Sequence, residues 1–510
     1  MDECRLIYRR QFLLSREPIT QLSYWNHFEL RNKSHLYVHP DLNVCLKECP
    51  DRQLVLIGYI FDYQGTTKTD EDIIDDIMAK IDSFGSLVKI LKRYAGQYAI
   101  IYINREVFNI IHDALGLREI YYCQSVNRVI CGSQPNLLKE FGIPRITLTQ
   151  DKNKKKFYEH DMKKVRAGRL WVGDETYFEN VKHLLPNHYL DIRTLETCRY
   201  WPNEKIQNLE LNVAVDLACN FLRGILKAAC NRHDLMMAVT AGTDTRTLLA
   251  ASKDIKDKIY YFINKHKSLS DRHPDIYVPK AIFQALGLPF HIHELDREVD
   301  EMFRNIFLNN VFMASELRLS VIYNVYFKQH SHRLNILGVG EIGRSFFGRR
   351  PKNLNGYFLA RALKYKDSLY AIEKCQEWLD RTLPAAEEYG VDIMTLLYWE
   401  QHLGNWGVVG NSESDIAIEE FDPFNSHYLY ETLLGVNKKF TKYGHNILFK
   451  EMIRNMWPVL IEFPINPPYR FYDRLRNWLI KYNLFDPIRN LVYKIDWLKF
   501  KVKQIREREL

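Results

Sequence analysis

The chain has 510 residues, of which 46% are apolar, and a formal net charge of +8. This length is too great for one ordinary core and predicts two or three folded domains. No apolar run approaches the roughly 18 to 20 residues that a membrane span needs, and charges interrupt Met1 to Ser15. We therefore expect a cytoplasmic protein without a transmembrane segment.

The nine cysteines are odd in number and contain no CxxC pair. Cys45 and Cys49 are four positions apart, but no histidine or second cysteine pair stands close enough to complete four zinc ligands. We expect free thiols rather than a disulfide framework or a zinc site.

The first 150 residues carry short β-type runs, at 54–59 and 98–103, and one helical segment at 70–90. They predict a sheet-rich domain. The stretch 151–169 is dense in lysine and has no sustained apolar period, which predicts an exposed basic loop. Small strands follow up to Trp201, so we place the first domain at 1–205.

From about residue 208 the pattern alternates between helix and strand. Strands separated by helices indicate right-handed crossovers and a mainly parallel sheet. From about residue 355 the pattern is helical throughout, so the second domain, at 206–470, is expected to be α/β with a helical continuation. The predicted order is helix 213–229, strand 235–239, helix 245–252, strand 259–263, helix 274–286, strand 290–293 and strand 334–337.

Residues 471–510 form a basic tail. From Arg470 to the end there are eleven Lys or Arg against five Asp or Glu, a surplus of six of the eight net charges. A basic amphipathic helix of this kind contacts an anionic membrane surface or nucleic acid, but more commonly packs its stripe on its own protein, and we favour packing here. The apolar positions at helical spacing are Ile488, Leu491, Val492, Ile495, Leu498, Val502 and Ile505, with Lys499, Lys501 and Lys503 among them and Trp478 and Trp497 nearby.

The most specific chemistry follows the predicted strand 235–239, in the sequence TAGTDT at 240–245. A strand, a tight turn of small residues and a helix N-terminus aim backbone N–H groups and the positive end of the helix dipole at an anion. Neither GxxxxGK[ST] nor GxGxxG occurs in this turn. On this pattern alone, a phosphate cradle and a polar turn with a threonine cap are equally compatible.

The loop resembles the SGGxDS pyrophosphate loop of the asparagine synthase family and related ATP pyrophosphatases. Thr240 and Thr245 keep the two hydroxyls, Gly242 keeps the second glycine, and Ala241 replaces the first. If position 241 needs a positive φ, its methyl group costs about 1 kcal/mol. The resemblance implies that Asp244 holds Mg²⁺ and that ATP is contacted by Thr240, Ala241, Gly242, Thr243, Asp244, Thr245 and Gly340.

A second element, LGVGEIGRSFFG at 337–348, resembles the family's LSGEGADELFGG. Gly340, Glu341, Phe347 and Gly348 match, and Glu341 falls on the family's catalytic glutamate. Arg344 replaces an aspartate that gives the family a second magnesium contact. A guanidinium has no lone pair to offer a metal, but it can contact pyrophosphate directly. We therefore take Glu341 and Arg344 as the candidate catalytic residues.

Further segments extend the resemblance. Asp275 opens a helix as in the family, FDPFNSH at 421–427 resembles its RVPFLD segment with Glu431 four positions on, and Asn466 stands at its catalytic lysine. The aromatic residues at 398–406 are expected to pack between helices. His291 and His293 lie two apart on a strand, and we expect at most one to face a site.

The N-terminal third is similar to class II glutamine amidotransferases through GQYA at 96–99, HDALGLR at 112–118 and IYY at 120–122. Their chemistry needs an N-terminal cysteine, whereas Asp2 is the second residue here and Cys4 lies inside the chain. Ile57 replaces the oxyanion asparagine, and losing one such donor costs about 2.7 to 4 kcal/mol. Cleavage before Cys4 would leave Ile57 in place, so we expect no glutamine hydrolysis.

The resemblance covers most of residues 50–470. It implies an Ntn-hydrolase-like α+β domain followed by an α/β domain of the adenine-nucleotide α-hydrolase, or ATP pyrophosphatase, type. The implied activity is an AMP-forming ligase that uses ATP and Mg²⁺ to adenylate a small-molecule or peptide carboxylate and transfers it to ammonia or an amine. The alternative, favoured by Ala241, Arg344 and Asn466, is an inactive pseudoenzyme that acts as a binding or regulatory module.

Overall fold

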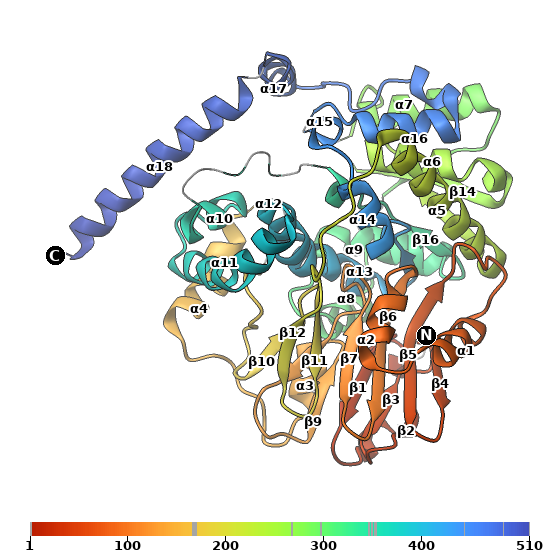
Figure 1. Ribbon diagram of the computed structural model, residues 1–510, viewed down its shortest axis with the longest axis vertical. Coiled ribbons are helices and arrows are strands. Elements are labelled where there is room, and N and C mark those ends of the chain that lie inside the picture. The colour runs from red at the N-terminus through yellow and green to blue at the C-terminus, as the bar shows by residue number, and fades with distance from the viewer. Residues whose placement is uncertain are drawn as a thin grey trace.

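The computed structural model describes residues 3–165, 171–266, 269–295, 298–344, 347, 350, 354–442, 444–482 and 484–508. At residues 341, 486, 501 and 503–508 it describes the backbone alone. The chain forms two antiparallel sheets, then a parallel sheet with helices around it, and two C-terminal helices (Figure 1).

Two six-stranded antiparallel sheets make up most of the N-terminal region. Their facing sides enclose an apolar core, as alternating strand residues require. In order, the first sheet is β10 (Val181–His183), β8 (Tyr121–Cys123), β9 (Val129–Gly132), β1 (Phe12–Ser15), β3 (His35–Val38) and β2 (Asn26–Glu29). The second is β12 (Glu196–Arg199), β11 (His188–Asp191), β7 (Phe108–His112), β6 (Ala95–Asn104), β5 (Arg52–Phe61) and β4 (Val44–Glu48).

Two helices, α1 (Asp70–Lys80) and α2 (Phe84–Leu91), replace the single helical segment expected at 70–90. Each begins with its own capping box, at Thr69 and at Ser83. A new helix begins at the second cap, because the backbone of Ser83 is extended, with φ −149° and ψ 168°, and its hydroxyl accepts from the first turn of α2. A further helix, α3 (Pro135–Phe141), follows β9.

The basic segment 151–169 is not the exposed loop that its lysines predicted. It forms α4 (Lys152–Lys156), a π-turn at Phe157–Asp161 and a 3-10 turn at Met162–Lys164, and residues 166–170 lie outside the described part. Phe157 and Met162 are buried, and the Phe157 ring lies 4.9 Å from that of Tyr370. Two apolar anchors five positions apart are too few to show as a period among lysines.

The parallel sheet confirms the prediction of helix-connected parallel strands. In order it contains β15 (His291–Glu294), β14 (Ile259–Lys265), β13 (Leu235–Ala238), β16 (Leu334–Ile336) and β17 (Glu419–Phe421). Along the chain, β14 and β15 follow one another on one side of β13, and β16 and β17 then follow one another on its other side. The carboxyl edge between β13 and β16 is therefore a topological switch point, where open α/β sheets bind ligands.

β17 lies within the part that was expected to be wholly helical, so that expectation was wrong. This three-residue edge strand contains the buried Glu420, whose carboxylate accepts from Asn335 at 3.0 Å and Arg318 at 2.9 Å. A buried glutamate held by distant partners gives no apolar signal in the sequence.

Helices cover the parallel sheet and continue beyond it. Helix α7 has the bounds that were predicted, and α5 is longer than predicted at both ends. Tyr398 and Trp399 are buried as expected, whereas Trp406 is 42% exposed. The helices are α5 (Leu211–Arg232), α6 (Thr243–Ala251), α7 (Pro274–Leu286), α8 (Glu301–Asn310), α9 (Glu316–Val321), α10 (Gly356–Ala362), α11 (Leu369–Tyr389), α12 (Ile393–Leu396), α13 (Val408–Ser414), α14 (His427–Leu434), α15 (Lys438–Thr441), α16 (Ile447–Met456), α17 (Phe471–Lys481) and α18 (Phe485–Arg508).

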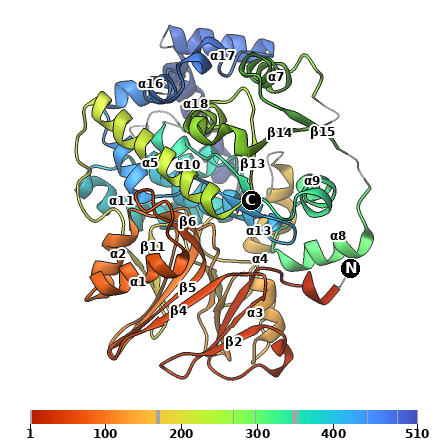
Figure 2. The ribbon, with the colours of Figure 1, turned by 90° about the vertical axis from the view of Figure 1, so that its right-hand side faces the viewer.

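Buried polar contacts join the antiparallel sheets to the second region. Arg118 forms an ion pair with Asp415 at 3.0 Å, and the side-chain Nδ2 of Asn425 donates to Asp113 at 2.8 Å. Near the N-terminus, the amide of Tyr8 donates to Asn310 of α8 at 2.8 Å, and Figure 2 shows the N-terminus beside this helix. The two regions therefore share one buried polar interface.

The tail does not pack its apolar stripe on the body, so that expectation was wrong. Ile488 is 44% exposed and Leu491 is 59% exposed. A different side of α18, with Tyr493 and Phe500, contacts α10. Within the described ranges, every helix is too short or too polar to cross a bilayer.

Candidate functional site

The two loops singled out in the sequence lie side by side at the switch point. One follows β13 and leads into α6, and the other follows β16. Helix α6 begins at Thr243, two positions earlier than predicted, with Gly242 as its N-cap. The connection between β13 and α6 is therefore only four residues long, from Val239 to Gly242.

This turn requires no left-handed backbone conformation. Gly242 has a φ of −72°, and Ala241 is not among the residues with positive φ. The methyl group of Ala241 therefore causes no backbone strain, and the cost that a positive φ would have imposed does not arise. Alanine is an acceptable replacement for glycine at this position.

Two side chains of the loop, and Asp275 of α7, accept hydrogen bonds from the loop's backbone amides. The Thr240 amide donates to Thr245 Oγ1 at 3.2 Å, and the Gly242 amide donates to Thr240 Oγ1 at 3.1 Å. The Ala241 amide donates to Asp275 Oδ1 at 3.0 Å. A phosphate can therefore use these three donors only by displacing two hydroxyls and one carboxylate.

Asp244 and Arg344 form a close ion pair between the two loops. Arg344 Nη2 donates to Asp244 Oδ1 at 2.9 Å and to Oδ2 at 2.7 Å. The two side chains are 16% and 15% exposed. Burial raises the pKa of the Asp244 carboxyl, while the Arg344 charge and the Gly340 amide lower it. The pair thus neutralises the carboxylate that the sequence assigned to magnesium.

Gly340 is close to this pair for a steric reason. A Cβ at position 340 would lie 2.7 Å from Asp244 Oδ1, which is too close for any side chain. The glycine therefore allows the second loop to approach the carboxylate. The backbone of Glu341 starts a 3-10 turn, Glu341–Gly343, but its side chain lies outside the described part, as do Ser345, Phe346 and Gly348.

With Arg344 in this place, the arrangement does not fit a magnesium ion at Asp244. A cation there would meet a guanidinium instead of lone pairs. Across the described ranges, no group of three or more His, Cys, Asp or Glu side chains is placed to hold a metal ion.

Asn466 lies against the phosphate-loop candidate. Its amide donates to the Ala241 carbonyl at 2.8 Å, and its side-chain Nδ2 donates to Thr243 Oγ1 at 2.9 Å. Its φ of 49° is left-handed, a conformation that asparagine tolerates. The position aligned with a catalytic lysine thus reaches the loop, but with a neutral amide.

Arg246 is a residue that the sequence reasoning missed. Its buried guanidinium donates to the Leu460 carbonyl at 2.8 Å and the Pro464 carbonyl at 3.3 Å, and burial lowers its pKa to about 10. It fastens the segment before Asn466 to α6. An arginine in the first turns of a helix gives no sequence signal for such a role.

Three further residues that the sequence analysis singled out lie elsewhere. Glu431 accepts from Lys92 and from Trp201 Nε1, each at 2.9 Å, and so joins the two regions. His291 and His293 both lie against Tyr260, with ring centroids 4.1 and 5.8 Å away. The two rings lie on the same side of the sheet, because residues two apart on a strand share one face.

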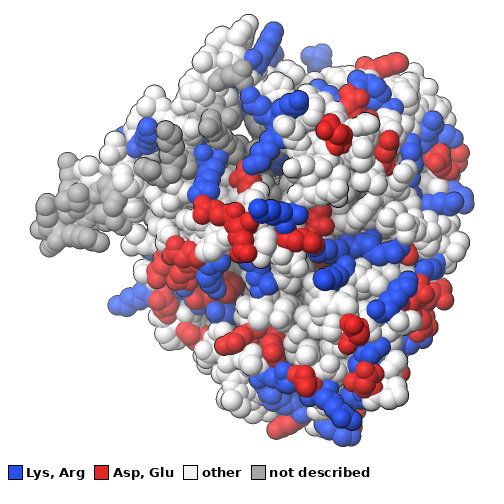
Figure 3. All heavy atoms as spheres, in the orientation of Figure 1, with Lys and Arg blue, Asp and Glu red and all other residues white. Residues whose placement is uncertain are grey.

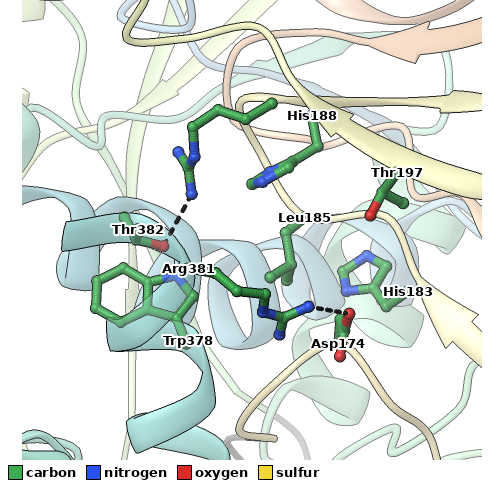
Figure 4. Close-up of a pocket in the computed structure, with 9 residues that line it drawn as sticks. Asp174, His183, Leu185, His188, Thr197, Trp378, Arg381 and Thr382 are labelled. Atoms are coloured by element: carbon green, nitrogen blue, oxygen red, sulfur yellow. Dashed lines mark hydrogen bonds and ion pairs between the residues drawn. The ribbon is translucent and has the colours of Figure 1, made fainter. Parts of the chain in front are cut away.

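A cavity of about 210 Å³ lies away from these loops, between β10 to β12 and α11 (Figure 4). Its charged side chains are already paired: Arg381 meets Asp174 at 3.5 Å, and Arg199 donates to Glu400 Oε2 at 2.9 Å. Burial lowers the pKa of His183 to about 3 and that of His188 to about 4. The cavity is therefore lined by neutral imidazoles and satisfied ion pairs.

In the antiparallel region, Cys4 is exposed in a 3-10 turn, Glu3–Arg5, eight positions before β1. Ile57, which the resemblance aligned with an oxyanion asparagine, is fully buried in the core between the two sheets. Its aliphatic side chain has no hydrogen-bond donor to offer.

No protein-family model and no curated protein matches the sequence. The solved structures that are similar to it at low identity include the following three. An NH3-dependent NAD synthetase from Campylobacter jejuni subsp. jejuni is 12% identical over 41% of this chain and 94% of that chain, with a TM-score of 0.20. Glutamine phosphoribosylpyrophosphate amidotransferase from B. subtilis is 10% identical over 66% and 70%, with a TM-score of 0.23. An allosteric regulatory enzyme of purine biosynthesis is 9% identical over 72% and 75%, with a TM-score of 0.24. Superpositions of this quality do not bear on activity.

Proposed function

We propose that this protein is an ATP-dependent, AMP-forming carbon–nitrogen ligase of the asparagine synthase type, without glutaminase activity of its own. One observation carries the proposal. Two loops at the switch point of a parallel sheet meet at one carboxylate, Asp244, which binds Arg344 and abuts Gly340. The positive end of α6 begins beside them, where an anionic ligand is stabilised.

In this proposal the triphosphate of ATP lies at the N-terminus of α6 and takes over the hydroxyls of Thr240 and Thr245. Arg344 leaves Asp244 and binds the β and γ phosphates, because a guanidinium fork matches phosphate oxygens. A magnesium ion that accompanies ATP would take Asp244 only after this exchange. Breaking the ion pair is thus part of ligand binding.

The chemistry then follows in two steps. An oxygen of the substrate carboxylate attacks the α phosphorus, the bond to the bridging oxygen breaks, and pyrophosphate leaves with the bonding electron pair while the Arg344 guanidinium stabilises its negative charge. An amine nitrogen attacks the acyl adenylate, its proton passes to Glu341, and AMP leaves as the amide forms. Since the aliphatic side chain of Ile57 supplies no oxyanion donor, the amine in this proposal is ammonia or a nitrogen of a second substrate.

The test is ATP–pyrophosphate exchange over a panel of small-molecule and peptide carboxylates, with wild type and Asp244→Asn. We expect exchange with at least one carboxylate, and a loss of about a hundredfold in the variant, because a neutral amide is a poorer ligand than a carboxylate for the magnesium ion that accompanies ATP. Asp62→Asn is the matched control: Arg93 Nη2 binds its two oxygens at 3.0 and 3.2 Å, in the antiparallel region. Equal exchange by the two variants would contradict the role of Asp244.

A second candidate function is a nucleotide-binding or regulatory pseudoenzyme. The closed Asp244–Arg344 pair, the occupied loop amides and the neutral Asn466 all favour it. Calorimetry with ATP, with and without magnesium, separates the two. Tight binding that is indifferent to magnesium, together with no exchange for any carboxylate, would support the pseudoenzyme.

A further inference from the structure

We propose that the C-terminal helix pair, α17 and α18, seats the protein on the surface of an anionic lipid bilayer. This inference is independent of the reaction at the switch point. It rests on where the described apolar side chains are exposed, which sides of the two helices contact the body, and where the charges lie.

Exposed apolar side chains are concentrated in this helix pair. Of the 24 large apolar residues that are exposed in the described ranges, fourteen lie between Tyr469 and Val502. On α17, one stripe at helical spacing contains Phe471, Leu475, Trp478 and Tyr482, exposed by 78%, 43%, 52% and 55%. Soluble surfaces rarely carry such continuous apolar patches unless something covers them.

The apolar stripe of α18 is equally continuous. Ile488, Leu491, Ile495, Leu498 and Val502 follow one another at intervals of three and four, and are exposed by 44%, 59%, 44%, 58% and 48%. This spacing places them along one side of the helix. Figure 1 shows α18 projecting from the body, with the C-terminus at its far end.

Each helix contacts the body with a different side. On α18, Tyr493 packs on Phe358 of α10 at 4.8 Å between ring centroids, and Phe500 packs on Tyr357 at 4.6 Å. Arg361 of α10 donates to Asp496 at 2.6 Å. On α17, Ile480 packs at Gly444, where an added Cβ would lie 2.8 Å from it. These contacts hold the pair while leaving both apolar stripes uncovered.

Basic side chains flank the stripe of α18. Lys494 is exposed one turn from Leu491 and Leu498, and Lys499 is exposed one turn from Ile495 and Val502, on the other flank. Asp496 is turned to Arg361 on the docked side. An apolar face bordered by lysines is the pattern of a helix that lies in the interface of an anionic bilayer, because the lysines reach the headgroups while the apolar face enters the acyl boundary.

Charge and composition favour a bilayer over the other occupants. The three-and-four spacing also suits a coiled coil, but a second copy would bring lysines against lysines along both flanks. Nucleic acid would engage the cations and leave the aliphatic side chains in water. Trp478 and Tyr482 on α17 suit the interfacial region, where aromatic residues with a polar edge concentrate. Over the body, by contrast, basic and acidic side chains are interspersed on the face shown in Figure 3.

The test is co-sedimentation of the full chain with vesicles of phosphatidylcholine, alone or with about one third phosphatidylserine. We expect binding to the anionic vesicles that falls at least tenfold at about 0.5 M salt, where charges are screened. A variant that combines Leu491→Gln, Ile495→Gln and Leu498→Gln should lose at least tenfold in binding. The variant Lys494→Gln with Lys499→Gln should lose the preference for phosphatidylserine.

A matched control combines Val126→Gln, Leu317→Gln and Leu369→Gln, which are 87%, 70% and 50% exposed outside the helix pair. This control should bind as wild type does, and unchanged thermal melting would show that all variants fold. The proposal is overturned if wild type sediments with neither vesicle. It is also overturned if the tail mediates self-association in sedimentation equilibrium, or retention on duplex DNA or RNA, without vesicle binding.

Discussion

The carboxyl edge of the parallel sheet and the core between the antiparallel sheets differ in the side chain that stands at a position to which the resemblance assigned chemistry. At the sheet edge, Asp244 keeps its carboxylate and binds Arg344, so the group is masked but recoverable. In the antiparallel core, the position that the resemblance aligned with an oxyanion donor holds Ile57, whose aliphatic side chain is fully buried. An ion pair can open when a ligand competes for it, whereas a packed core cannot regain a donor. This difference is why we assign chemistry to one region and not to the other.

Ile57→Asn would break the comparison if the antiparallel region still had latent glutaminase activity. We expect the free energy of unfolding to fall by about 3 to 5 kcal/mol, because apolar contacts are lost and an amide is buried among aliphatic neighbours. Glutamine hydrolysis should remain absent. Denaturant unfolding and a glutaminase assay check both statements, and a stable variant that hydrolyses glutamine would contradict them.

Arg344→Asp would sharpen the comparison by putting a second carboxylate beside Asp244. Without magnesium the two like charges should lower the melting temperature. At magnesium concentrations of about a hundred times Kd, the ion should restore about 2.7 kcal/mol of stability. Thermal melting with and without magnesium measures this. A variant that responds to the ion no more than wild type does would show that the position cannot form a metal site.

Acid should destabilise the buried histidines of the antiparallel region more than the sheet edge. The folded pKa of His183 is about 3, below its unfolded value near 6.5, so the unfolded chain takes up the proton first as pH falls. Stability should decline between about pH 6.5 and pH 3, by about 2 kcal/mol at pH 5 for this residue. His183→Gln should flatten the pH dependence of the melting curve, and an unchanged slope would count against this residue.

Ala241→Gly should have the smallest effect. Because position 241 does not use a positive φ, glycine gains nothing there and only loosens the unfolded chain. We expect a loss of about 0.5 to 1 kcal/mol in stability and no gain in ATP affinity. Calorimetry and thermal melting provide the comparison, and tighter nucleotide binding by the variant would mean that the ligand-bound loop needs a glycine.

Local patterns predicted much of this fold. The bounds of α7, and the positions but not the bounds of four of the five parallel strands, followed from apolar periods and from a proline at the start of the helix. The loop after β13 followed from small residues between a strand and a helix. The cap at Ser83 and the buried Phe157 were missed, because a single hydroxyl or anchor is hidden within a polar run.

The pairing within the candidate site was beyond the reach of local patterns. Asp244 and Arg344 are a hundred positions apart, and the sequence reasoning had placed magnesium and pyrophosphate where the structure joins the two side chains. Glu420 illustrates the same limit, because its buried carboxylate is held by partners more than eighty positions away. Such contacts depend on the order of strands in the sheet, which one sequence does not specify.

The hydrogen bonds of Asn466 link the turn after β13 to the segment that leads into the C-terminal helices. Asn466 is tied to Ala241 and Thr243, and Phe471, where α17 starts, follows only five positions later. Arg246 binds the segment just before Asn466 through the Leu460 carbonyl. A force on the terminal helices would therefore act on the turn after β13. Attachment of these helices to a surface and the conformation of that turn are thus coupled through a short segment that Asn466 and Arg246 hold in place.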